Sequence, residues 1–165
     1  MSFDAFLVFS DTIKGETTDS QFNSQGGIDI YSFSWGLSNP SSVGVGSGLG
    51  AGKVSISSLN VHKRVDSAST DLALCCASGK HLSTATLYVR KAGGDSKVTY
   101  LQVTLTDVLV DAVQISGAAG GEDYPTESVS LAFGKIQVQY TPQTEQGAAG
   151  TPKEFGWNLE GNVKM

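Results

Sequence analysis

Apolar and polar side chains alternate residue by residue through much of this chain, and this two-residue period restricts the fold more than any other feature. The clearest run covers residues 98–106. Leu101, Val103 and Leu105 share one face of an extended chain, and Tyr100, Gln102, Thr104 and Thr106 share the other. The pattern is typical of a strand with one buried face. We therefore expect a fold built mainly from β-strands.

Other strand-like segments lie along the whole chain. They are Phe3–Phe9, Ile28–Trp35, Val54–Val61, Thr86–Arg90, Leu109–Ile115, Val129–Tyr140 and Glu154–Leu159. Thr86–Arg90 is the expected hairpin partner of residues 98–106, because a turn-rich connection with adjacent glycines joins the two runs. Several short strands separated by turns predict an antiparallel sheet.

The alternation slips once, within Val129–Tyr140. Val129, Leu131 and Phe133 fall on odd positions, whereas Ile136, Val138 and Tyr140 fall on even ones. One inserted residue near Gly134 would return the apolar side chains to the same face. The sequence therefore predicts a β-bulge at Gly134.

One segment has helical periodicity instead. Residues 66–69 are rich in capping side chains, and Leu72, Cys75 and Cys76 then recur at helical spacing before Gly79. A glycine is the usual residue just beyond a helix C-terminus. We expect a single α-helix over about Ser67–Ser78.

The size and composition suit one β-rich domain. The chain has 165 residues, of which 16% are charged and 20 are glycine. This length fits a single domain over residues 1–165, with its own hydrophobic core. We expect a compact β-barrel of two antiparallel sheets with the helix on its flank, since closure also removes exposed strand edges.

The charge balance excludes two classes of partner. The formal net charge is −5, whereas nucleic-acid surfaces are built from clustered Lys and Arg, so no nucleic-acid partner is expected. No segment approaches the roughly 20 consecutive apolar residues of a membrane span, so no membrane insertion is expected.

The N-terminal residues and the cysteines bear on localisation. The first eleven residues lack a positively charged start, and their apolar run is too short for a signal-peptide core. Export by the general secretory route is therefore not expected. Cys75 and Cys76 are adjacent and cannot link distant segments through a disulfide. Folding in a reducing cytosol is the simplest interpretation.

Motifs for nucleotide binding are incomplete. Gly46–Ala51 matches a relaxed dinucleotide pattern, but a strand follows it where a helix N-terminus should hold the pyrophosphate. Gly52 and Lys53 resemble the end of a P-loop, yet Val54 stands where a hydroxyl should bind the metal. No cofactor is expected.

The sequence signals for catalysis and for metal binding are equally weak. His62, His81, Cys75 and Cys76 lack metal-ligand spacing, and neighbouring helical cysteines diverge by about 100°. The carboxylates of Asp107, Asp111, Glu122 and Asp123 fit solvated loops or strand ends better than an enclosed acid and base pair. No catalytic residue and no metal site is expected, so we predict that the protein is not an enzyme.

A long glycine-rich arm interrupts the β pattern over residues 38–52. It is uncharged until Lys53, and glycine occupies every second position from Gly44 to Gly52. Uncharged loops of this length are uncommon in compact domains and are often functional. Alternating glycines allow close backbone approach, and Val43, Val45 and Leu49 supply apolar anchors. We predict that this arm contacts another molecule through Val43, Gly44, Val45, Gly46, Gly48, Leu49 and Gly50.

A second candidate surface lies on the strand that precedes the arm. Phe33 and Trp35 are the stronger core candidates, which places Ser32 and Ser34 on the opposite face. Ile28 and Ile30 share the parity of the serines, so a regular strand would make that face partly apolar. We therefore expect Ser32 and Ser34 to lie on an exposed face that a binding partner can reach.

Several short segments, taken in order, form a distinctive series. They are Asp11–Glu16, Ser32–Gly36, Gly50–Val54, Ser78–His81, Arg90–Gly94, Gly121–Asp123 and Phe155–Asn158. Over essentially the whole chain the series resembles the Hcp (haemolysin-coregulated protein) family of bacterial type VI secretion. The combination is specific, although no single piece is.

This resemblance implies a β-barrel subunit that assembles into hexameric rings around a wide hole. The rings stack as the inner tube of a contractile injection machine of Gram-negative bacteria, beneath a spike protein and inside a contractile sheath. Under this resemblance Ser32 and Ser34 face the lumen, where effector proteins bind as cargo, and the glycine-rich arm contacts a neighbouring subunit or the next ring. The subunit itself is secreted from the cytoplasm without a cleaved signal peptide, a role tied to virulence. Some members carry an added C-terminal toxin domain, which is not expected here.

A second class of function stays open at this stage, a stand-alone enzyme or binding module. Formation of rings by the purified protein discriminates between the two.

Overall fold

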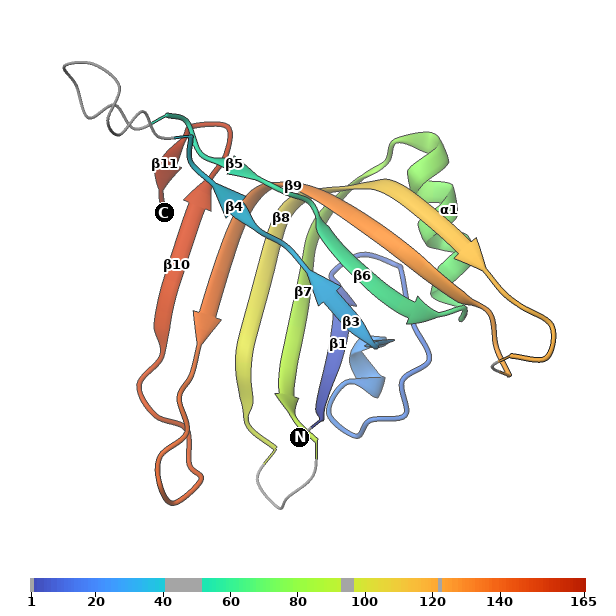
Figure 1. Cartoon of the computed structure of the whole chain (residues 1–165), viewed down its shortest axis with the longest axis horizontal. Helices are drawn as coiled ribbons and strands as arrows, with labels where there is room; N and C mark the ends of the chain where they lie inside the picture. The colour runs from blue at the N-terminus through green and yellow to red at the C-terminus, as the bar shows by residue number, and fades with distance from the viewer. Residues whose placement is uncertain (1, 41–51, 93–96, 122) are drawn as a thin grey trace.

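The computed structural model describes residues 2–40, 52–92, 97–121 and 123–165 of the chain. Its strands are β1 (Phe3–Phe9), β2 (Ile28–Ile30), β3 (Ser32–Ser34), β4 (Leu37–Ser38), β5 (Ser55–Ile56), β6 (Leu59–Arg64), β7 (His81–Lys91), β8 (Thr99–Ser116), β9 (Thr126–Tyr140), β10 (Lys153–Asn158) and β11 (Val163–Lys164). The helices are a short 3-10 turn, η1 (Asn23–Gln25), and α1 (Ala68–Ser78). The expectation of a mainly β fold with one flanking α-helix is confirmed (Figure 1).

The main sheet has nine strands and curls into a barrel-like shape. Its path runs β11-β10-β9-β8-β7-β1-β2, and β6 pairs with both β9 and β3. Only Tyr31 separates β2 from β3, so the segment that pairs with β1 continues directly into the segment that pairs with β6. The ladder is not fully closed, but the chain itself brings the two edges together. β4 and β5 form a separate two-stranded sheet.

The core follows the alternation seen in the sequence. Val103 and Leu105 of β8 are fully buried, as are Leu87 of β7 and Leu131 of β9. Each strand of this kind buries alternate side chains, and the pairings of the described strands are antiparallel. The apolar period therefore corresponds to a single core inside the curved sheet.

The break at Gly134 is present, but it is not a β-bulge. Thr106 pairs with Lys135 and Val108 with Phe133, so the register between β8 and β9 continues unchanged across it. In β8 the buried positions change from odd to even numbers opposite Gly134, at Asp107, which has a φ of 56°. Asp107 in β8 and Gly134 in β9 each interrupt the alternation by one residue. Because the two interruptions lie opposite each other, the pairing of the strands stays in register. The register shift between β8 and β9 lies instead between Val110 and Ala112.

Helix α1 lies within one residue of its expected bounds, and its C-terminus has the expected glycine cap. Gly79 adopts the left-handed conformation, with a φ of 66°, and its N–H donates to the Cys75 carbonyl. Leu72 and Cys75 are buried in the core, and Cys76 is half-buried beside it. Both cysteines are free thiols. The helix lies against β8, at the side of the sheet (Figure 1).

Nothing in the described part of the chain forms a helix of the length and apolar character needed to cross a membrane.

Candidate interaction surfaces

Ser32 and Ser34 are both exposed on β3. The half-buried Phe33 between them packs against the core, as does Trp35. Ile28 and Ile30 are buried, although they share the parity of the serines. The chain changes face at Tyr31, between β2 and β3, so the expected mixing of isoleucines with serines does not occur.

The strand register extends the surface around these serines across four strands. Ser32 lies opposite His62 of β6, and His62 lies opposite Ser128 of β9. In the next row, Asn60 and Ser130 follow Ser34 in the same way. Exposed Gln114 of β8 continues the first row. We call Ser32, Ser34, Asn60, His62, Gln114, Ser128 and Ser130 the serine face.

The serine face is polar and carries no permanent charge. His62 Nδ1 and Ser128 Oγ are 3.1 Å apart, which fixes the imidazole across two strands. The sequence analysis missed all members but the two serines, because the others lie between 26 and 98 positions further along the chain. The alternating polar positions of residues 59–64 and 126–131 were the available indication.

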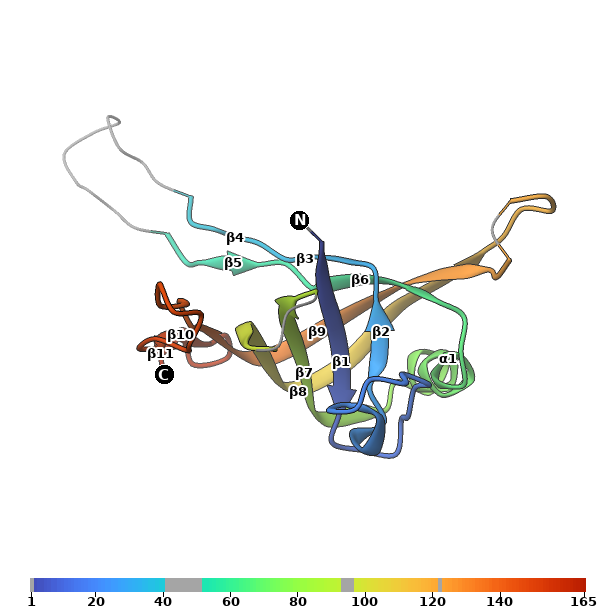
Figure 2. The same ribbon diagram turned by 90° about the horizontal axis from the view of Figure 1, so that it is seen from below.

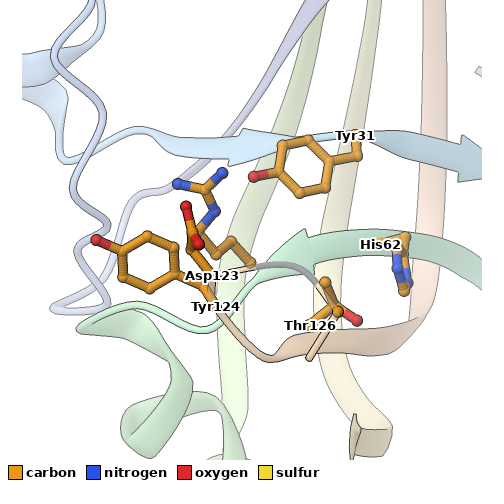
Figure 3. A pocket seen from close by; sticks show the side chains of 7 residues that line it. Tyr31, His62, Asp123, Tyr124 and Thr126 are labelled. Atoms are coloured by element: carbon orange, nitrogen blue, oxygen red, sulfur yellow. The ribbon is translucent and has the colours of Figure 1, made fainter. Parts of the chain in front are cut away.

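A pocket lies at one end of the serine face. It is an open hollow with a volume of about 770 Å³, lined by Tyr31, His62, Arg64, Gly121, Asp123, Tyr124 and Thr126. The Arg64 guanidinium carbon lies 4.7 Å from the centre of the Tyr124 ring and 5.8 Å from that of Tyr31. Figure 3 shows Tyr31, Tyr124 and Thr126 around the opening. We call this site the tyrosine pocket.

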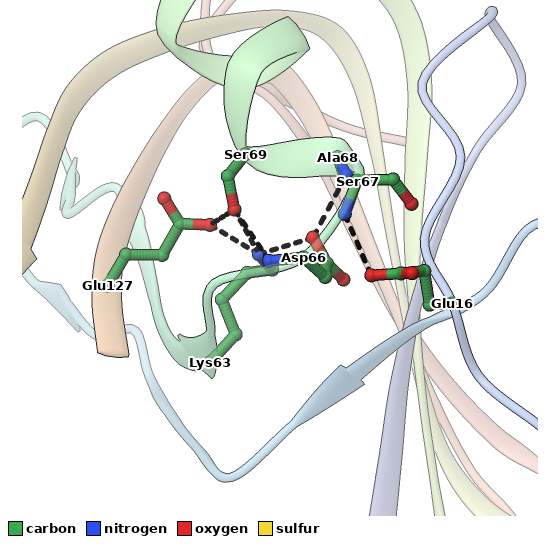
Figure 4. A network of polar contacts seen from close by, with 7 residues as sticks. All are labelled: Glu16, Lys63, Asp66, Ser67, Ala68, Ser69 and Glu127. Carbon is green, nitrogen blue, oxygen red and sulfur yellow. Dashed lines mark hydrogen bonds and ion pairs between the residues drawn. The ribbon is translucent and has the colours of Figure 1, made fainter. Parts of the chain in front are cut away.

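A cluster of charged side chains lies on the opposite, core-facing side of the same strands. Lys63 of β6 and Glu127 of β9 are fully buried and form an ion pair. Lys63 Nζ also donates to Asp66 Oδ1 at 2.8 Å and to Ser69 Oγ at 3.2 Å. These last two residues bound the first turn of α1, so the cluster joins the helix to the sheet (Figure 4).

The predicted arm starts and returns through the β4–β5 ribbon. Leu37 pairs with Ile56, and the Gly52 N–H donates to the Pro40 carbonyl at 3.1 Å. The ribbon projects away from the barrel, on the side opposite the β8–β9 connection (Figure 2). The predicted contact residues Val43, Gly44, Val45, Gly46, Gly48, Leu49 and Gly50 lie outside the described residues. Their role stays a prediction.

The titratable groups considered for catalysis are dispersed. His81 is exposed at the start of β7, and Asp111 Oδ2 accepts a hydrogen bond from Ser58 Oγ at 2.9 Å. Asp123 lines the tyrosine pocket, and Glu122 lies outside the described residues. Within the described ranges, no three His, Cys, Asp or Glu side chains gather as metal ligands do.

Comparison with known proteins identifies the family to which this chain belongs. Residues 6–140 match the family described as type VI secretion system effector, Hcp. The chain belongs to the Hcp family. Its sequence is 43% identical to Protein hcp1 of Pseudomonas aeruginosa over 165 residues, covering 99% of each chain. The expected family is thereby confirmed.

Solved structures agree. A type six secretion system protein superposes with a TM-score of 0.92 at 34% identity, covering 99% of this chain and all of the other. Hcp1 from Salmonella typhimurium superposes with a TM-score of 0.80, also at 34% identity, with both chains fully covered. This Hcp-family chain is therefore a β-rich protein of the type VI secretion system.

Proposed function

We propose that this Hcp-family chain is a structural subunit of the type VI secretion inner tube. It forms homohexameric rings that stack inside a contractile sheath and beneath a spike protein, and it carries effector proteins in the ring lumen. It acts without catalysis, by assembly and expulsion, passing from the bacterial cytoplasm to the outside without a cleaved signal peptide. The observation that carries the proposal is the Hcp fold, matched over the whole chain.

Unpaired strand edges support assembly through two different surfaces. His81, the first residue of β7, pairs with Leu109, so beyond this point β8 pairs only with β9 among the described strands. At another edge of the sheet, residues 153–155 of β10 have no partner among the described residues on the side of β11, whereas Gly156 accepts a hydrogen bond from the Met165 N–H. Exposed Ile115 and Phe155 lie on these two edges. Two unlike edges suit the heterologous contacts that close a ring.

Native mass spectrometry of the purified protein tests the ring. We expect a dominant species of six times the 17.2 kDa chain mass, with rings visible by negative-stain electron microscopy. Interfaces of about 800 Å² per partner would keep such rings intact at micromolar concentration. A monomer throughout that range contradicts the proposal.

Replacing Ser34 with arginine is expected to reduce cargo retention and leave the ring intact. Ser34 is exposed on the serine face, so a larger side chain there does not disturb the core but does change the surface offered to cargo. Proteins that co-purify with the wild type from the native host are compared with those of S34R, with S34T as the matched control. If S34R retains them equally, Ser34 is not part of the cargo surface.

Deleting Val43–Leu49 is expected to leave the barrel folded and to impair ring stacking and secretion. The β4–β5 ribbon needs only a short connection, so the deletion does not strain the strands. Ordering a free arm costs about 1–2 kcal/mol per residue, which contacts with another chain must offset. Circular dichroism, electron microscopy and export assays measure the outcome. Normal tubes and normal export would show that the arm is only a tolerated loop.

A further inference from the structure

The tyrosine pocket contains an arginine, Arg64, whose guanidinium lies beside two aromatic rings. Both tyrosine ring centres lie within the 6 Å or so over which cation–π attraction acts on a guanidinium. Lys63 and Arg90 are paired with carboxylates, but no carboxylate of the residues described forms an ion pair with Arg64. Arg64 is an exposed residue, so the planar group of N–H donors beside the two rings is open to another molecule.

The nearby carboxylates are largely committed to other donors. Glu16, Asp29 and Asp66 line an adjoining depression with Arg64, and each accepts a hydrogen bond from within the chain. The donors are the Ser67 N–H to Glu16, the Thr17 hydroxyl to Asp29, and Lys63 and the Ala68 N–H to Asp66. Asp123 is the one described acidic residue that lines the tyrosine pocket itself.

We propose that the tyrosine pocket binds a carboxylate side chain of an acidic segment in a cargo protein. Arg64 supplies a bidentate pair of N–H donors to the carboxylate, and the Thr126 hydroxyl and His62 supply further polar contacts at the rim. Tyr31 and Tyr124 pack against the stem of the bound side chain. Tyrosine and arginine are also the residue types that contribute most to protein-binding hot spots.

Continuity with the serine face identifies the occupant as cargo. His62 belongs to both surfaces, since it lines the pocket and lies opposite Ser32 in the strand register. This part of the argument rests on the proposed function, in which the serine face is the cargo surface. The proposal adds a chemical preference to it. The uncharged serine face contributes breadth of contact, and Arg64 selects acidic segments.

The charge of Asp123 determines in which direction the affinity for a charged ligand should change when that charge is removed. Its carboxylate shares the pocket with Arg64, so it repels an acidic ligand and would attract a basic one. Removing its charge must therefore strengthen binding of a carboxylate and weaken binding of a cation. A pocket that recognises neither charge would not respond.

The experiment measures fluorescence anisotropy of a rhodamine-labelled hexaglutamate peptide titrated with the full-length protein. We expect saturable binding that R64Q weakens by about tenfold and D123N strengthens by about threefold. K80Q is the matched control, because it removes one exposed positive charge beyond helix α1 and should change the affinity little. Hexaglutamine and hexalysine peptides should not bind.

Several results would overturn the proposal. These are equal weakening by K80Q and R64Q, weaker binding by D123N, or preferential binding of hexalysine. Native mass spectrometry of each variant separates this proposal from the proposed function. A wild type that is monomeric and still binds hexaglutamate through Arg64 refutes the ring alone. If R64Q dissociates the ring, the pocket is a contact between subunits, and the assignment to cargo is wrong.

Discussion

Replacing Lys63 with methionine is expected to lower the free energy of unfolding by about 3–5 kcal/mol. Lys63 and Glu127 are both fully buried, so the substitution leaves a carboxylate in the core without its partner. The Ser69 hydroxyl, which donates to Glu127 Oε1 at 2.5 Å, cannot neutralise that charge. Among the described residues, Glu127 Oε2 has no hydrogen-bond partner even in the intact cluster.

The double variant distinguishes loss of a partner from loss of the pair. Replacing Lys63 and Glu127 together with methionine removes both fully buried charges, and apolar replacements of buried ion pairs are often close to neutral. Asp66 loses its lysine partner but is partly exposed and still accepts a hydrogen bond from the Ala68 N–H. We expect K63M/E127M to recover most of the stability lost in K63M. Exposed Lys80→Met is the matched control and should change stability by less than about 0.5 kcal/mol.

Urea unfolding followed by circular dichroism measures these differences. All variants are compared at one protein concentration, because assembly shifts apparent stability. The cluster ties the start of α1 to β6 and β9, so the amide protons of the helix should also exchange faster in K63M. A K63M protein as stable as K80M would show that the buried pair contributes nothing.

Replacing Arg90 with methionine is expected to lower the free energy of unfolding by about 3 kcal/mol and to make residues 10–27 more mobile. Arg90 is 1% exposed and pairs with Asp19, and its Nη1 donates to Gln21 Oε1 at 3.2 Å. The guanidinium carbon also lies 4.9 Å from the Phe6 ring centre and 5.6 Å from that of Phe22. The Arg90 side chain of β7 thus holds residues 10–27 against the sheet.

Arg90→Lys is the matched control for this site. Lysine keeps the charge near Asp19 but loses the planar group that stacks on the two phenylalanine rings. We therefore expect R90K to lie between the wild type and R90M in urea unfolding. Limited proteolysis should cut residues 10–27 faster in R90M. Equal stability of R90K and R90M would mean that the charge of Arg90 is not important.

Asp19 also gives the site a dependence on pH. Burial opposes its ionisation, but hydrogen bonds from Arg90 and the Gln21 N–H, with the charges of Arg90 and Lys97, hold the pKa of Asp19 below its ordinary value. A lowered folded pKa stabilises the protein above the unfolded pKa, and this contribution is lost as pH falls through the folded value. Below about pH 4, unfolding should depend less steeply on pH in D19N than in the wild type.

Local sequence patterns were sufficient to predict most of the elements. The alternation in residues 98–106 located the first part of β8, which continues without a break through the separately predicted Leu109–Ile115. The apolar run at the N-terminus predicted β1 with the bounds Phe3–Phe9. Capping residues and Gly79 placed α1 to within one residue. These features depend on neighbours within a few positions, whose side-chain directions the backbone period determines. The family resemblance was likewise readable from short segments in order.

Contacts between distant segments decided the rest. The pairing of β6 with β9 places His62 opposite Ser128 on the outside and Lys63 opposite Glu127 in the core, although about 65 residues separate them. The turn at Tyr31 separates the isoleucines from the serines, and the matched insertion at Asp107 replaces the bulge expected at Gly134. By itself the sequence determined which residues share a face of each strand. Only the tertiary structure decided which strands are neighbours, because register depends on packing and closure across the whole barrel.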